Sequence, residues 1–495
     1  MGDLPVRKTP LLFDFLYNSL APYKPSPHDA RGINTLGEAL DSEWYTNRHG
    51  KTRMSLDDLR RGPNGFEPPQ PPFEVIDGKN EGVNPGFQMR DGRKRLFFVK
   101  FDPPGHPELA TAPDVIGTKF FHALGYNTPD NYIFVAAGED FQIASDAKFT
   151  GNSGEERQMR RPDFDRILAK AQSQKGGRVR FVASRAIEGK PIGPFRFEGT
   201  RSDDPNDNIP HEDRRELRGL AIFSAWLNHT DSKAGNTLDV IVEENGVKFV
   251  KHYLLDFGSS LGSNSISPKD ARDGYEYFLS TEWKPMLRDM SLLGLHVKPW
   301  ETAHYPRQRS IGRFGSQPFN PDEWVSNFPN HAFESRRPDD GFWAARQVMR
   351  FTPEEIRAIV ETGQYSDAKD ADYLVQKLIE RRDIIGKTIF AKVLPLDEFR
   401  VLNNGLEFED LAVKYGFLPS RQYDFGWSRV DNRNSNTESL SGQNSAQLPA
   451  DWQNAAIGSY YEARITEKGR PDKVALVSLQ KTSDGAKVVG IRRTW

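Results

Sequence analysis

Apolar and polar positions alternate differently along the chain, and these changes predict its elements. Residues 1–75 show little periodicity and are rich in Pro, Gly, Arg and Asp, which predicts an extended arm. The aromatic and β-branched run at residues 96–101 predicts a strand, as do residues 131–136. Between them, helical spacing over residues 114–124 predicts a helix that ends at Gly125.

The later part of the chain has a more helical pattern. Residues 212–227 predict a helix with one apolar face, and two short strands follow near residues 237–242 and 247–255. Residues 353–392 predict a long helical region, because Thr352 and Pro353 form a good helix start. Alternation of apolar and polar residues from 460 to 495 predicts a small sheet.

Two polar stretches have a structural and a functional interpretation. Residues 138–178 predict a solvated helical insertion, but four clustered arginines could instead dock an acidic substrate or phosphate: Arg157, Arg160, Arg161 and Arg166. Residues 201–207 have the oxygen density of a calcium loop but lack its terminal Glu, so we interpret them as a rigid loop near the cleft.

These transitions divide the chain into five predicted parts. They are an extended arm (1–75), a strand-rich lobe with the polar insertion near 138–178 (76–186), a helical lobe (187–431), a linker rich in Ser, Asn and Gly (432–447) and a small β appendage (448–495). Trp44 and Tyr45 are expected to anchor the arm in grooves of the globular body. The predicted fold class is α+β, with two lobes, a wrapping N-terminal arm and a small C-terminal β appendage.

Composition and charge exclude several classes of function. The 495 residues carry a net charge of −2, so no global basic field attracts nucleic acid or an anionic membrane. The absence of cysteine excludes disulfides, thiolate zinc sites and cysteine nucleophiles. The zinc-protease motif H-E-x-x-H does not occur. No transmembrane run or signal peptide is evident, so we expect a soluble protein, cytoplasmic or exported with its leader removed.

The strongest chemical signal is the run from His229 to Asn236. It has the spacing H-x-D-x-x-x-x-N directly after a predicted buried helix. In phosphoryl-transfer enzymes an Asp in the place of Asp231 orients the acceptor hydroxyl, and the Asn ligates Mg²⁺. Lys233 would lie near the transferred phosphoryl group and offset its developing charge.

A second motif supports the first. Asp256, Phe257 and Gly258 follow an apolar strand, with room for two short strands after Asn236. This is the order and context of the metal-binding Asp-Phe-Gly element. The sequence therefore predicts that Asn236 and Asp256 hold a metal ion together.

Lys100 at the end of the first strand is the third candidate. A Lys in this place would bridge the α- and β-phosphates of ATP and would need a carboxylate partner near the following helix. Glu108 and Asp114 both qualify, and the sequence does not choose between them. We prefer Glu108 for its longer reach, since Asp114 could simply cap the helix.

Glycines upstream of Lys100 are candidates for a loop over the phosphates. Gly82 and Gly86 lie before a strand, although not in the G-x-G-x-x-G form. Glu188, in the connector at residues 187–191, is taken as a further nucleotide contact.

Together these residues resemble the atypical kinases, namely the HipA-like, phosphatidylinositol-kinase-like and CotH-like families. Residues 228–236 look more like their short D-x-x-x-x-N loops than like H-R-D-L-K-P-E-N. Residues 41–48, 82–87 and 125–129 also resemble a bacterial branch of such proteins. Thr230 replaces the Arg that reads activation-loop phosphorylation, which argues against control by that route.

The resemblance implies a two-lobed protein-kinase-like fold and an ATP- and Mg²⁺-dependent phosphotransferase, with Mn²⁺ as an alternative metal. The acceptor would be a hydroxyl on a protein or a small molecule. Two alternatives stay open: a nucleotide-binding pseudokinase or scaffold, and an AMP transferase that uses the same cleft.

Overall fold

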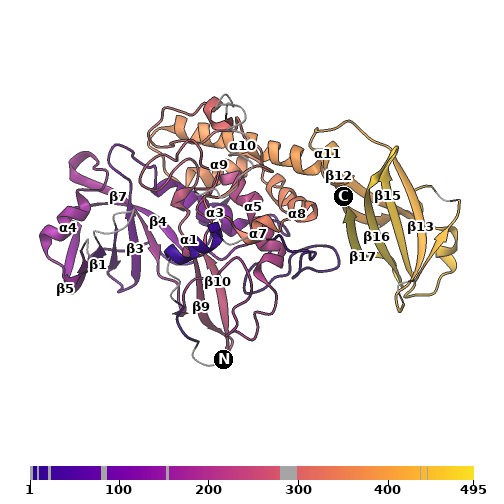
Figure 1. The fold of residues 1–495 in the computed structure, drawn as a ribbon, viewed down its shortest axis with the longest axis horizontal. Coiled ribbons are helices and arrows are strands. Elements are labelled where there is room, and N and C mark those ends of the chain that lie inside the picture. Colours follow the sequence, from indigo (N-terminus) through magenta and orange to yellow (C-terminus); the bar gives the residue numbers. More distant parts are fainter. Residues whose placement is uncertain are drawn as a thin grey trace.

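The computed structural model describes residues 4–7, 11–20, 24–79, 86–151, 155–278, 298–434, 436–442 and 444–495. Over these ranges the fold is α+β, with three parts arranged along the longest axis (Figure 1). A seven-stranded sheet lies at one end, helices fill the middle and a five-stranded sheet lies at the other end. Among the described residues, no helix is long and apolar enough to cross a membrane.

The seven-stranded sheet has the strand order β4-β7-β3-β2-β1-β5-β6. Its strands are β1 (Phe73–Lys79), β2 (Gly86–Arg90), β3 (Leu96–Phe101), β4 (Asn131–Ala137), β5 (Phe141–Thr150), β6 (Glu156–Gln158) and β7 (Arg178–Arg185). All neighbours are antiparallel except β1 and β5. Strand β3 is hydrogen-bonded on both sides, so its side chains project from a rigid backbone.

The two faces of β3 have different surroundings. Phe97 and Val99 are buried in an aromatic core that includes Phe164. Phe98 and Lys100 alternate with them and project from the opposite face, because successive side chains of a strand point to opposite sides. This alternation directs Lys100 toward the middle of the molecule.

The polar stretch at 138–178 is part of this sheet, which differs from the solvated helical insertion expected from its composition. Strand β5 combines buried Phe141 and Phe149 with exposed polar residues. Helix α4 (Arg161–Leu168) covers the sheet with buried Phe164. The buried positions of β5 do not keep a two-residue period, and its pairing with β1 shifts register, so alternation gives no signal for this strand.

Three of the four clustered arginines form ion pairs within the segment. Arg157 lies 2.6 Å from Asp163, Arg166 lies 3.8 Å from the same carboxylate, and Arg161 lies 2.8 Å from Asp165. Ion pairs within the segment argue against the interpretation as a phosphate-docking face.

Helices form the middle of the molecule. They are α3 (Thr111–Ala123), α5 (Arg215–Leu227), α7 (His331–Glu334), α8 (Pro338–Met349), α9 (Pro353–Glu361) and α10 (Ala368–Phe390). Helix α5 is buried along its whole length and packs against α8 and α10. The region predicted as helical over 353–392 is divided into α9 and α10, because the Asp367 side chain caps a new helix by accepting from the backbone of Lys369.

Short 3₁₀ turns connect many of these elements. They are η1 (Gly138–Asp140), η2 (Lys175–Gly177), η3 (His211–Asp213), η4 (Ala234–Asn236), η5 (Phe257–Ser259), η6 (Pro299–Thr302) and η7 (Ala450–Asn454).

A small sheet of order β10-β9-β8 positions the two motifs. Its strands are β8 (Lys190–Pro191), β9 (Thr237–Glu244) and β10 (Val247–Leu254). The β9–β10 hairpin starts directly after Asn236 and ends just before Asp256. The backbone N–H of Leu255 donates to the carbonyl of Asn236 at 2.9 Å, so both motifs lie at the same end of the hairpin.

The C-terminal part is larger than the predicted appendage. It contains β11 (Leu396–Leu402), β12 (Gly405–Asp410), α11 (Leu411–Lys414), β13 (Tyr423–Asp431), β14 (Asn436–Leu440), β15 (Tyr460–Glu467), β16 (Arg470–Thr482) and β17 (Gly485–Thr494). The five-stranded sheet has the order β14-β13-β15-β16-β17, so strands before residue 448 belong to it. Strand β14 lies inside the predicted linker. The sequence gives no sign of a strand there, because its five side chains are polar or only partly buried.

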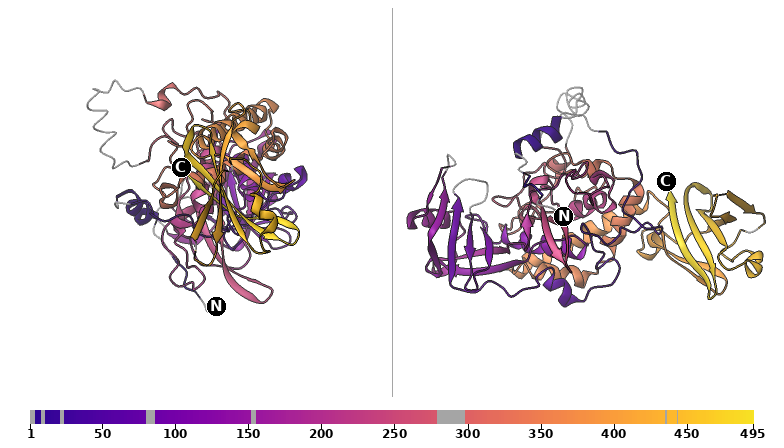
Figure 2. Two further views of the ribbon diagram at one scale, coloured as in Figure 1. Left: turned by 90° about the vertical axis from the view of Figure 1, so that its right-hand side faces the viewer. Right: turned by 90° about the horizontal axis from the view of Figure 1, so that it is seen from below.

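The N-terminal arm carries α1 (Leu11–Leu20) and α2 (Leu56–Arg61). Helix α1 lies on the outside of the helical part (Figure 2). Trp44 and Tyr45 are buried, with 3% and 0% exposure, and so anchor the arm. Thr35 accepts a backbone hydrogen bond of 2.9 Å from Ile491 of β17, which links the arm to the C-terminal sheet.

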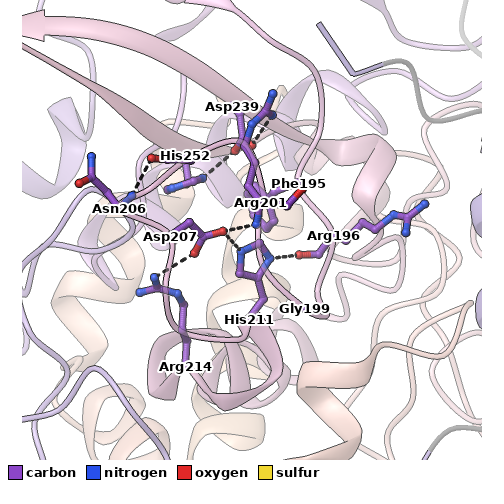
Figure 3. A network of polar contacts seen from close by, with 12 residues as sticks. Phe195, Arg196, Gly199, Arg201, Asn206, Asp207, His211, Arg214, Asp239 and His252 are labelled. Atoms are coloured by element: carbon purple, nitrogen blue, oxygen red, sulfur yellow. Dashed lines mark hydrogen bonds and ion pairs between the residues drawn. The ribbon is translucent and has the colours of Figure 1, made fainter. Parts of the chain in front are cut away.

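A buried polar network holds the loop at 201–207 (Figure 3). Asp207 lies 2.7 Å from His211 and 3.3 Å from Arg214. Asp239 pairs with His252 at 2.6 Å and with Arg201 at 3.0 Å. Because basic partners neutralise these carboxylates, the geometry favours the rigid loop over a calcium site.

Candidate active site

The loop after α5 holds Asp231 with two side chains. Lys233 Nζ lies 2.8 Å from Asp231 Oδ1. Asn236 Nδ2 donates to the Asp231 carbonyl at 2.8 Å and to its Oδ2 at 2.9 Å. The loop begins where Asn228 ends α5 in a left-handed conformation, with φ of 52°. Three residues of the predicted motif thus form one hydrogen-bonded unit.

Asp256 lies at the end of β10 in a left-handed conformation, with φ of 59°. The next residue, Phe257, is fully buried and stacks on Phe121 of α3, with ring centroids 4.9 Å apart. Its backbone N–H donates to Asp114 Oδ1 at 3.2 Å. This packing fixes the backbone that carries Asp256.

Lys100 connects the large sheet to these loops. Its Nζ lies 2.7 Å from Asp256 Oδ1 and 3.5 Å from Asp114 Oδ2. Burial disfavours the ammonium, but the attraction of Asp256 and then Asp114 outweighs it and raises the pKa of Lys100. Burial raises the pKa of Asp114, whereas Lys100 overcomes the same effect at Asp256 and lowers its pKa.

The partner of Lys100 is Asp114, and the preference for Glu108 is wrong. Glu108 precedes α3, has a φ of 67° and is buried. Its two carboxylate oxygens accept from the backbone N–H of Ser366 at 3.0 and 3.1 Å. Glu108 therefore ties the start of α3 to the α9–α10 connection, and its greater reach is used there.

Lys100, the Asp231 loop and Asp256 border one cleft of about 700 Å³. Its lining includes the predicted residues Lys100, Asp231, Lys233, Asn236 and Asp256. This volume lies within the range of about 300–1,000 Å³ typical of sites for small molecules and cofactors.

The two predicted glycines have different outcomes. Gly82 lies outside the described residues. Gly86 lines the cleft but starts β2, and a Cβ there would come 2.4 Å from the carbonyl oxygen of Val99. The close approach of β2 and β3 therefore requires a glycine at position 86.

Glu188 lies apart from the cleft. It ion-pairs with Arg185 and its side chain is 72% exposed. Both residues line a separate hollow of about 380 Å³ that also includes Tyr253. The structure therefore does not bring Glu188 together with Lys100 and Asp256.

The cleft also contains residues that the sequence analysis did not select. Phe98 is 44% exposed on the same face of β3 as Lys100, and the two-residue alternation from Lys100 was the signal for it. Asp270, Asp273 and Phe328 line the side near Asp231. They lie in irregular chain segments, where periodicity gives no signal.

The cleft offers oxygen donors of the type that magnesium prefers. Among the described residues, no group of three or more His, Cys, Asp or Glu side chains is arranged to hold a metal. Asn236 Oδ1 and Asp256 Oδ2 have no hydrogen-bond partner within the described part of the chain. Protein sites for Mg²⁺ often supply one or two oxygen ligands and leave the rest to phosphates and water.

Comparisons with known proteins give a weak likeness. No family model matches the chain, and no curated protein matches it. A crystal structure of a Helicobacter pylori proinflammatory kinase, CtkA, matches with 12% identity and a TM-score of 0.32, covering 64% of this chain and 98% of that chain. A likeness of this size establishes neither a family nor a function for this chain.

Proposed function

We propose that the protein is an ATP- and Mg²⁺-dependent phosphotransferase, an atypical kinase that transfers a phosphoryl group to a hydroxyl acceptor. The observation that carries the proposal is the contact of Lys100 with Asp256 in the cleft that also holds the Asp231 loop, with buried Asp114 behind Lys100 as its second carboxylate. An ammonium, two metal-type oxygens and a nearby carboxylate are the groups that phosphoryl transfer needs.

Each side chain has a role that follows from its surroundings. Lys100, on the rigid β3, would neutralise charge on the phosphates of ATP. Asn236 and Asp256 would hold Mg²⁺, which supplies charge neutralisation when bound. Asp231 would orient the acceptor hydroxyl and accept its proton.

Lys233 is placed to act with Asp231. Its Nζ lies 2.8 Å from the Asp231 carboxylate and 5.3 Å from the ring centroid of Phe328. A cation in this position would offset negative charge on the transferred group. His229 does not compete as the base, because burial lowers its pKa to about 4 and it is not among the residues that line the cleft.

Two variants test the proposal. Asp256→Ala should lose Mg²⁺-ATP binding in isothermal titration calorimetry, whereas Asp231→Ala should bind Mg²⁺-ATP and lose transfer. Asp484→Ala, on an exposed turn of the C-terminal sheet, is the matched control and should behave as the wild type. Unchanged nucleotide affinity in Asp256→Ala would contradict the assignment.

Labelled ATP separates the proposed activity from its two alternatives. Transfer of label from γ-labelled ATP supports a kinase. Transfer from α-labelled ATP supports an AMP transferase, and binding with no transfer or hydrolysis supports a nucleotide-binding scaffold.

A further inference from the structure

Lys269 lies in the segment that follows Asp256 and is 1% exposed. Its Nζ donates to the hydroxyl of Thr230 at 2.6 Å. Thr230 is fully buried and directly precedes Asp231. A side-chain hydrogen bond therefore joins the segment after Asp256 to the loop that carries Asp231.

The backbone around this contact is also fixed. The Lys269 N–H donates to the Gly262 carbonyl at 2.9 Å, and the Lys269 carbonyl accepts from the guanidinium of Arg313. On the other side, the Thr230 carbonyl accepts from the N–H of Asn327 at 2.7 Å. Both ends of the Lys269–Thr230 contact are thus held by backbone hydrogen bonds, and Thr230 is bonded directly to Asp231 in the chain.

The charge of Lys269 is not compensated by direct contact. Within the described ranges, no carboxylate oxygen lies within 4.0 Å of Lys269 Nζ, the limit for an ion pair. Burial lowers its pKa to about 8, while Asp273, Asp231 and Asp270 oppose the change. These three carboxylates all line the cleft, so the charge of the buried Lys269 acts on acidic side chains of the site.

A lysine that served only to fill space would be energetically unfavourable at this buried position. Burying an ammonium with one hydroxyl partner costs folding free energy, and a methionine of similar shape would fill the space without that cost. An action of the Lys269 charge and hydrogen bond on the Thr230–Asp231 loop would account for a lysine at this position.

We propose that Lys269 is a positioning residue for phosphoryl transfer, which fixes Thr230 and so holds the Asp231 carboxylate in its reactive position. This inference rests on the proposed function. It adds a link between the Asp256 segment and the Asp231 loop that needs no phosphate on the segment.

The test compares three variants with the wild type. Lys269→Met removes the charge and the hydrogen bond, Lys269→Arg keeps a charge and donors, and Thr230→Val removes only the hydroxyl. We expect Lys269→Met and Thr230→Val to lower kcat by roughly 10- to 100-fold, because small misplacements of a catalytic group have effects of that order. KM for ATP and the affinity for Mg²⁺-ATP should stay within about twofold, since Lys100 and Asp256 are untouched.

Rescue and coupling distinguish positioning from general stability. Lys269→Arg should recover a large part of kcat, and the double variant Lys269→Met with Thr230→Val should be no slower than the slower single variant. A folded Lys269→Met protein with wild-type kcat would overturn the inference. If that variant does not fold, wild-type kcat in Thr230→Val would overturn it equally. A wild-type protein that transfers no phosphoryl group would instead overturn the proposed function on which the inference rests.

Discussion

The pairing of Lys100 with Asp114 gives a sharp test of the cleft. Asp114→Asn keeps the Oδ1 acceptor that binds Asn131 and the N–H of Phe257, at 3.1 and 3.2 Å. It replaces Oδ2, which lies 3.5 Å from Lys100 Nζ, by an amide that cannot pair with an ammonium. The perturbation therefore acts on Lys100 and leaves the packing in place.

The expected loss follows from the remaining contacts of Lys100. A hydrogen bond to a charged group contributes roughly 1.5–3 kcal/mol, and the lower end applies because this contact is long. Lys100 keeps its 2.7 Å contact with Asp256, and without Asp114 it would compete more strongly with a metal ion for the Asp256 carboxylate. We expect a loss of about 1.5 kcal/mol, which is about a tenfold weaker Mg²⁺-ATP affinity.

We expect Asp114→Asn to lower the affinity for Mg²⁺-ATP without lowering the free energy of unfolding. Because burial raises the pKa of Asp114 above its ordinary value, its ionised form costs folding free energy once the pH exceeds about 4. Asp114→Asn removes that buried charge, so urea unfolding at pH 7 should show a variant at least as stable as the wild type. Weaker binding without lower stability is the signature of a residue kept for function.

Glu108→Gln is the matched control. It retains one acceptor for the N–H of Ser366 and should bind Mg²⁺-ATP as the wild type does, with a loss in stability of about 1 kcal/mol. Calorimetric titration of a non-hydrolysable ATP analogue measures all three proteins. Equal losses of affinity in the two variants, or none in Asp114→Asn, would refute the reasoning.

Two further predictions concern the nucleobase and acid stability. Phe98→Ala should weaken ATP binding by about 1–3 kcal/mol, the range for base stacking on an aromatic ring, while calorimetry with inorganic triphosphate shows no change. Burial would raise the pKa of Asp207, but the hydrogen bond from His211 outweighs it and lowers that pKa to about 2. The ionised carboxylate therefore contributes about 2.5 kcal/mol above pH 4 that is lost as the pH falls through 2, so Asp207→Asn should be less stable than the wild type in urea at pH 7 and close to it at pH 2. Equal destabilisation at both pH values would contradict this account.

The sequence predicts best what depends on local spacing. The Asp231–Asn236 loop and Asp256 follow from motifs beside one helix and one hairpin, and the structure brings them into one cleft. The choice between Glu108 and Asp114 depends on how α3 docks, and Glu108 is held by Ser366, far away in the sequence. No local pattern carries that information.

Elements with polar strands are missed for a related reason. β5 and β14 carry many polar side chains, so composition indicates an insertion and a linker. Their pairing with β1 and β13 decides their structure, and pairing partners are set by the whole sheet. The C-terminal part begins earlier than predicted, because β11, β12 and β13 lie in residues assigned to the helical lobe and β14 lies in the predicted linker.

The central ion pair explains why metal and nucleotide should act together. In this structure Lys100 and Asp256 neutralise each other at 2.7 Å. A phosphate that takes Lys100 would leave Asp256 without its cation, and a metal ion alone would leave Lys100 without one of its two anions. In the proposed function, Mg²⁺-ATP would supply both partners at once and so would replace one ion pair by two, with no charge left uncompensated. Asp114, 3.5 Å from Lys100, would then keep the ammonium in place while its other partner changes.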